Sequence, residues 1–118
     1  MAVENYTPDN LVIGDDIITD SVTISIGQTI TRGAVLGKVT ATGEYVLSLS
    51  GATDGSQVAS AIAVEDVNAT VAAVTNVAVY IRGEFNENAL TFGTGHSAAT
   101  TKDDLRQVGV YIKSVVAR

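Results

Sequence analysis

SVTISIGQTITRGAVLGKVTATGEYV, residues 21–46, is the stretch that decides the fold of this chain. Val22, Ile24 and Ile26 are apolar and alternate with polar residues, which is the two-residue period of a half-buried strand. Gly27 then interrupts the alternation. The pattern predicts a strand that ends near this glycine and carries the three apolar side chains on its inner face.

The second half of the stretch contains three closely spaced glycines: Gly33, Gly37 and Gly43. Glycine allows a positive φ angle or the close approach of a neighbouring strand, and both are useful at the corners of a small barrel. A new strand is expected at residues 38–41, and it should turn at residues 42–44 into a partner strand that begins at residues 45–47. These features predict a tightly wound β-domain.

Composition supports this fold class. The chain has 118 residues, of which 46% are hydrophobic but only 5% aromatic, and it contains no Trp. The core must therefore consist mainly of Val, Ile, Leu and Ala, and the β-branched members favour strands. A chain of this length is expected to form one domain with a sizeable core. We predict a mainly β fold, a small β-barrel over residues 21–118, with an extended N-terminal arm over residues 1–20.

The second half of the chain predicts further strands and two short helices. Strands are expected at residues 58–67, 77–81 and 110–116. Residues 86–90 can form one helical turn. A longer helix is expected to begin near Thr100, whose hydroxyl would cap it, and to end at Gly109.

Charge and residue usage exclude several classes of function. The formal net charge is −6, and residues 1–20 contain acidic residues but no Lys or Arg. Since neutralising phosphates requires a basic surface, nucleic-acid binding is disfavoured. Without Cys, neither disulfides nor thiolate metal sites are expected. The sequence shows no signal-peptide pattern and no apolar stretch near the ~20 residues that span a bilayer, so no membrane contact is expected.

No group of residues has a catalytic or metal-binding pattern. The one histidine, His96, lies among Gly, Thr and Ser and is expected to be exposed. Glu65 and Asp66 are adjacent, so on a strand they would point to opposite faces. We interpret them as solvated, or as partners for an Arg across a subunit contact. The chain is therefore expected not to be an enzyme and to hold no cofactor and no metal.

The N-terminal arm contains more large apolar side chains than a disordered tail. They form two groups: Leu11, Val12 and Ile13, and then Ile17 and Ile18. Such a segment can be the first strand of its own domain, or it can add a strand to the edge of a partner's sheet. Residues 58–81 are rich in small apolar side chains and poor in charge, which favours apolar contacts between subunits.

Four segments occur in order along the chain: GQTITRGAVLGKVTATG (27–43), AIAVEDV (61–67), VYIRGEFNE (79–87) and LRQVGVYIK (105–113). Together they resemble the head decoration proteins of lambda-like tailed phages, and the resemblance covers roughly residues 20–116. The resemblance implies a β-tulip-like barrel and a structural role in the virion.

The family resemblance implies a capsid decoration, or cement, protein. The chain is expected to form a homotrimer that binds the major capsid protein on the outer surface of the expanded head, at three-fold and quasi-three-fold positions. It would stabilise the head against the pressure of the internal DNA. Synthesis as a late protein in the host cytoplasm is expected. The arm is expected to contact the capsid through six residues: Tyr6, Leu11, Val12, Ile13, Ile17 and Ile18.

Two other functions remain as alternatives. GQTITRGAVLG, residues 27–37, is also similar to a turn of biotinyl and lipoyl carrier domains, which present one lysine at a hairpin tip. The candidates are Lys38, Lys102 and Lys113, and none is expected at such a tip. The chain is also compatible with a subunit of another trimeric phage β-assembly, such as a tail or fibre component.

Overall fold

The computed structural model describes residues 11–13 and 17–113. The strands, in chain order, are β1 (Ile18–Ile24), β2 (Gln28–Ile30), β3 (Val35–Lys38), β4 (Tyr45–Leu47), β5 (Ala59–Ala63), β6 (Val67–Ala69), β7 (Val74–Asn86) and β8 (Val110–Lys113). A 3₁₀ helix, η1 (Glu87–Ala89), follows β7, and one α-helix, α1 (Ala98–Gln107), precedes β8. The chain is mainly β with two short helices, as predicted.

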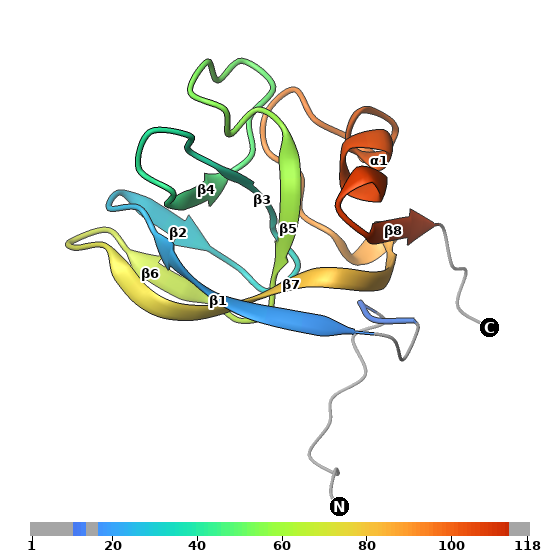
Figure 1. The fold of residues 1–118 in the computed structure, drawn as a ribbon, viewed down its shortest axis with the longest axis horizontal. Coiled ribbons are helices and arrows are strands. Elements are labelled where there is room, and N and C mark those ends of the chain that lie inside the picture. The colour runs from blue at the N-terminus through green and yellow to red at the C-terminus, as the bar shows by residue number, and fades with distance from the viewer. Residues whose placement is uncertain (1–10, 14–16, 114–118) are drawn as a thin grey trace, which may run out of the picture.

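Five strands close into a barrel (Figure 1). Neighbouring strands pair in the order β1, β4, β3, β5, β7, and β7 pairs back onto β1 to complete the ring. The closing β1–β7 pair is antiparallel and extends from Ile18 opposite Arg82 to Ile24 opposite Val74. Outside the ring, β8 lies parallel to the end of β7. Strands β2 and β6 form a separate antiparallel ribbon. The predicted small barrel is confirmed.

Two hydrophobic cores share strand β7. The barrel core contains ten buried residues: Ile24, Ile30, Ala34, Leu36, Ala61, Ala63, Val67, Ala69, Val77 and Val79. The second core lies between the barrel and α1 with β8, and contains Leu11, Val35, Ala59, Ile62, Tyr80, Phe85, Leu105, Val110 and Ile112. Val79 and Tyr80 belong to different cores because successive side chains of a strand point to opposite faces.

Strand β7 leaves the barrel at Gly83. Up to Arg82 it pairs with β1, and from Gly83 onwards it pairs with β8. Ile81 packs against the barrel core, whereas Phe85, four residues later, is buried in the second core. An even spacing would keep both side chains on one face, so the strand changes face between them. Gly83 lies at this point with a φ angle of 143°, in the region that favours glycine.

The glycines of residues 33–43 act as predicted. Gly33 and Gly43 have φ angles of 91° and 75°. Gly37 is needed for space: a Cβ atom there would lie 2.0 Å from the carbonyl oxygen of Ser56, in the loop before β5. Such a distance is impossible without moving backbone. The glycines at 33, 37 and 43 are therefore needed for backbone conformation or for the close approach of another backbone segment.

Several predicted boundaries are wrong. Ile26 is 61% exposed, because β1 ends at Ile24 and the chain turns at Gly27 with a φ angle of 94°. The strand expected at residues 38–41 ends at Lys38, which pairs with Tyr45 across the hairpin. The strand expected at residues 58–67 is two strands, β5 and β6, separated by a bend.

The main helix also begins earlier than predicted. Its N-cap residue is Ser97, and Thr100 lies in the first turn, where its Oγ1 accepts a hydrogen bond from the Ser97 N–H at 2.8 Å. The predicted stop is confirmed, since α1 ends at Gln107 and Gly109 has a φ angle of 97°. Leu105 on this helix is fully buried in the second core.

The close approach at Gly37 can be tested by substitution. Gly37→Ala should destabilise the protein by about 1–3 kcal/mol, the usual cost of forcing an extra carbon into packed structure. Gly51→Ala is the matched control, since a Cβ atom there would have no neighbour within 4 Å. Urea denaturation monitored by circular dichroism measures both. Equal stability of the two variants would contradict the described contact.

Candidate functional site

Residues 11–13 are attached to the end of β7. Val12 forms an antiparallel bridge with Phe85. The Asn86 N–H donates to the Leu11 carbonyl at 2.8 Å, and the Ile13 N–H donates to the Glu84 carbonyl at 3.0 Å. This short segment therefore lies beside β7 on the side opposite β8, as an additional strand-like neighbour.

Leu11 is part of the folded core. Its side chain is 1% exposed and lies in the second core with Phe85. Gly33 lies close to this side chain, since a Cβ atom there would be in van der Waals contact with Leu11 Cδ1 at 3.6 Å. Of the six residues expected to bind the capsid, Leu11 is thus covered by its own domain, Val12 and Ile13 are half-buried, and Tyr6 lies outside the described residues.

Ile17 and Ile18 are the exposed members of the expected capsid-binding set, at 36% and 46% exposure. Ile18 begins β1, which pairs along its length with β7. On its other side β1 pairs with β4 only where Ile24 meets Tyr45, as far as the described residues show. The first half of β1 therefore has one open backbone edge, which is a typical site for adding a partner strand.

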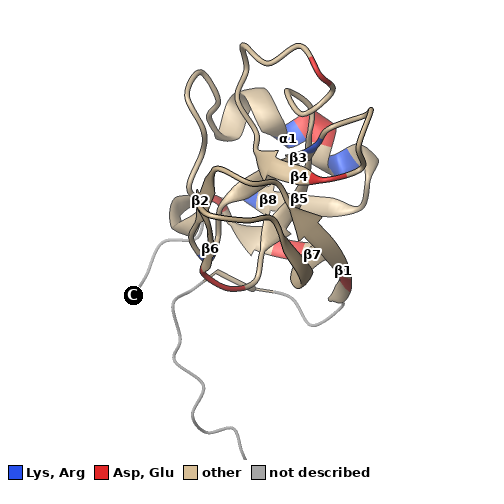
Figure 2. Ribbon diagram, turned by 90° about the vertical axis from the view of Figure 1, so that its left-hand side faces the viewer, with Lys and Arg blue, Asp and Glu red and all other residues tan. Residues whose placement is uncertain are grey.

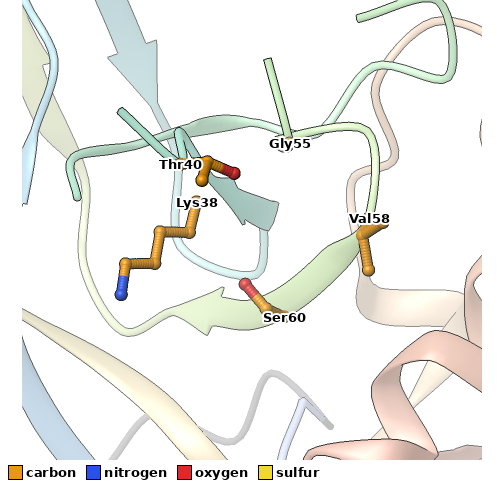
Figure 3. Close-up of a pocket in the computed structure, with 5 residues that line it drawn as sticks. All are labelled: Lys38, Thr40, Gly55, Val58 and Ser60. Atoms are coloured by element: carbon orange, nitrogen blue, oxygen red, sulfur yellow. The ribbon is translucent and has the colours of Figure 1, made fainter. Parts of the chain in front are cut away.

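A pocket of about 290 Å³ opens beside the β3–β4 hairpin (Figure 3). It is lined by Lys38, Thr40, Gly55, Val58 and Ser60, and the Lys38 and Ser60 side chains extend into the same space. Behind it, burial raises the pKa of Tyr45, and the Asp20 carboxylate raises it further, while the Ser60 hydroxyl acts in the opposite direction. The pocket offers one ammonium group and two hydroxyls, without a carboxylate or imidazole among its lining residues.

The three lysines considered for a carrier domain occupy other kinds of position. Lys38 is the last residue of β3, before the turn. Lys102 lies in α1, with its Nζ 3.4 Å from Glu87. Lys113 ends β8, and its Nζ lies 3.1 Å from Glu84. None of these positions is the tip of a hairpin, which a carrier domain requires.

His96 connects two loops, which the sequence did not predict. Its Nε2 lies 2.9 Å from the Gln57 carbonyl oxygen, and its Nδ1 lies 3.0 Å from Thr100 Oγ1. It is half-buried rather than exposed, so that expectation is wrong. A carbonyl can only accept, so Nε2 donates to it. The sequence showed a histidine in a loop, but residue spacing could not predict a hydrogen bond to Gln57, which lies 39 positions away.

Arg32 and Asp66 stabilise the corner between β2 and β5. Asp66 Oδ1 accepts a hydrogen bond from the Arg32 N–H at 2.8 Å, and Arg32 Nη1 donates to the Val64 carbonyl at 2.8 Å. The Arg32 guanidinium also lies 5.9 Å from the centre of the Tyr80 ring. Asp66 therefore has a partner within its own chain.

The described residues contain no group of three or more His, Cys, Asp or Glu side chains that could hold a metal ion. Within the same residues, no helix is both long and apolar enough to cross a membrane. The candidate binding surfaces are the open edge of β1 at Ile17 and Ile18 and the other exposed apolar side chains.

The burial of Leu11 gives a direct test of where the folded domain begins. Leu11→Ala should cost about 2–5 kcal/mol of unfolding free energy, as for other buried leucines. Ile17→Ala, the exposed control, should change it by less than about 0.5 kcal/mol. Chemical denaturation measures both. If Leu11→Ala is as harmless as the control, the segment does not belong to the core.

Comparison with known families gives a match over most of the chain. The family model of the bacteriophage lambda head decoration protein D matches residues 2–111, and a search of curated proteins found no match. The matched range covers nearly the whole chain, including the barrel, α1 and the residues before β1. The chain therefore belongs to the bacteriophage lambda head decoration protein D family, a family of structural proteins of the phage capsid.

Proposed function

We propose that this chain is a cement protein that binds the outer surface of the expanded phage head as a homotrimer. It occupies three-fold and quasi-three-fold positions and stabilises the head against the pressure of the packaged DNA. The observation that carries the proposal is the family match over residues 2–111. Its partners are the major capsid protein and two further copies of itself. The net charge of −6 supports a protein partner over nucleic acid.

The capsid anchor in this proposal is the N-terminal segment, divided into parts with different roles. Residues 1–10, with Tyr6, contact the capsid directly. Leu11 holds the base of the segment in its own domain, because its side chain is buried there. Ile17 and Ile18 contribute exposed apolar surface beside the open edge of β1. The backbone of that edge supplies hydrogen-bonding groups for an added strand.

The energy of attachment comes from apolar burial and repetition. Each buried CH₂ contributes about 0.8 kcal/mol, so Ile17 and Ile18 would strengthen capsid binding when the capsid covers their side chains. Three arms in one trimer make the attachment multivalent, and release then requires all three contacts to open together. Acidic residues near the arm, such as Asp20, orient the approach and affect the salt dependence more than the tightness of binding.

Stabilisation of the head follows from linkage. A ligand that binds one state of a shell and binds other states poorly favours that state by its binding free energy. A trimer that fits the expanded lattice therefore opposes both contraction and rupture. No catalytic step is needed, which agrees with a family of structural proteins.

The anchor is tested with expanded shells of the major capsid protein from the same phage. Deleting residues 1–10, combined with Ile17→Ser and Ile18→Ser, should weaken binding at least about tenfold per arm, since the lost apolar burial exceeds 1.4 kcal/mol. The variant should keep the circular dichroism spectrum of the full chain, because Leu11 is retained. Co-sedimentation with shells measures the binding.

The control for this experiment is Val58→Asp, which alters an exposed valine of the pocket beside β3. It should bind shells like the unaltered protein. Full decoration by the anchor variant would contradict the assignment of the anchor to this segment. Failure of the unaltered protein to bind shells would contradict the proposed function itself.

Self-association is tested separately by light scattering of the purified protein. The proposal expects about three times the 12.2 kDa mass of one chain at micromolar concentration and above. The mass should fall on dilution if the trimer is in equilibrium with single chains. A mass that stays at one chain over the whole concentration range would exclude the trimer in solution.

A further inference from the structure

Two turns form one end of the molecule. The β1–β2 turn and the β6–β7 turn lie side by side at the left of Figure 1, because β2 pairs with β6 and Gln28 lies opposite Ala69. The Gly27 N–H also donates to the Ala69 carbonyl at 2.7 Å. We call residues 25–29 and 68–76 the turn end.

The turn end carries no charge. Residues 21–31 and residues 67–81 contain no Asp, Glu, Lys or Arg, although these make up 17% of the chain. Figure 2 looks onto this end and shows β2 and β6 in tan, with a red segment of loop close to β6. The carboxylate of Glu44 lies at the border, where it accepts a hydrogen bond from the Ser25 hydroxyl at 2.8 Å.

The turn end also exposes the most open large apolar side chain of the described surface. Val71 is 88% exposed and Ile26 is 61% exposed. Single exposed apolar residues are ordinary, but here two occur on adjoining turns within an uncharged surface. By contrast, the other apolar residues of residues 58–81 mostly lie in the two cores. The apolar excess expected there from sequence is therefore confined largely to Val58 and Val71.

The charge distribution favours a second copy of this chain as the molecule that binds the turn end. Two copies that each carry a net charge of −6 repel one another, and the repulsion is greatest when acidic surfaces meet. The turn end is a surface on which two copies can meet without bringing like charges together. It has no acidic groups to select a basic partner and no basic groups to select an acidic one. Its neutral polar side chains, including Thr29 and Asn68, remain able to hydrogen-bond across a contact.

We propose that the turn end is the contact between subunits, with Ile26 and Val71 near the three-fold axis. This inference rests on the proposed trimer and assigns the surface that forms it. Strand β7 begins beside the turn end at Val74, and Val12 pairs with it at Phe85, near its other end. The proposed contact and the base of the proposed capsid anchor therefore lie at opposite ends of one strand.

Substitution with a charge tests the contact. Ile26→Asp and Val71→Asp should each raise the dissociation constant of the trimer at least a hundredfold in sedimentation experiments, because identical carboxylates would meet near the axis. Both residues are exposed, so the thermal unfolding of the dissociated chains should differ little. Val58→Asp, which changes an exposed valine outside the turn end, should leave the trimer intact.

The absence of cysteine allows a second, positive test. Val71→Cys should form an intersubunit disulfide or react with a short bismaleimide to join two chains, whereas Val58→Cys should remain single under the same conditions. If the Val71→Asp variant still forms a trimer, or if Val58→Asp dissociates it, this inference is overturned. The proposal that the chain forms a trimer would still hold.

The remaining outcomes separate the inference from the proposed function. An unaltered protein that stays a single chain at all concentrations, yet loses shell binding with Val71→Asp, would show that the turn end contacts the capsid protein and would overturn the assignment to a second copy. Dissociated Val71→Asp chains that still bind shells, but more weakly than the trimer, would support both the contact and the cement function.

Discussion

The change of partner along β7 at Gly83 is the constraint on which both cores depend. Before this glycine the strand closes the barrel against β1, and after it the strand supports β8. The φ angle of 143° at Gly83 permits the change of face that moves Phe85 out of the barrel and into the second core. There it packs against the Tyr80 ring, with the ring centres 5.1 Å apart. Without this switch, the Phe85 ring would be missing from the core that α1 and β8 cover, and Leu11 would lose this neighbour.

The same strand separates the two surfaces proposed for subunit contact and for capsid attachment. One end of β7 meets the segment that enters from the N-terminus, and the other end leads from the uncharged turn beside β2. A subunit contact at one end and an attachment to the shell at the other do not compete for the same residues. The distribution of charge fits this division, since residues 25–29 and 68–76 contain no acidic residue and the Glu44 carboxylate lies at the border of the turn end.

The barrel could be predicted from sequence, because alternation and glycine spacing are local properties. Gly37 could be singled out from its motif, but the backbone that it must leave room for, at Ser56 in the loop before β5, could not. Strand ends were less predictable: alternation continues to Ile26, yet the strand stops two residues earlier, before the turn at Gly27. The role of Leu11 could not be predicted, because its site is formed by residues such as Phe85 that lie far away in the chain. An apolar triplet in a polar segment is equally consistent with a partner contact and with a core residue. For the same reason His96, whose partner is Gln57, could not be placed.

Hydrogen exchange of the protein, followed free in solution and bound to expanded shells, tests the division of β7 into two functional ends most directly. The account predicts that the amides of residues 68–76 are protected in the concentrated free protein and lose this protection on dilution. Residues 1–10 and the open edge from Ile18 should gain protection only on the shell. The Asn86 amide, which donates to Leu11, should be protected in both states. Protection of residues 68–76 that appears only on the shell, or protection of residues 1–10 that depends only on protein concentration, would contradict the account.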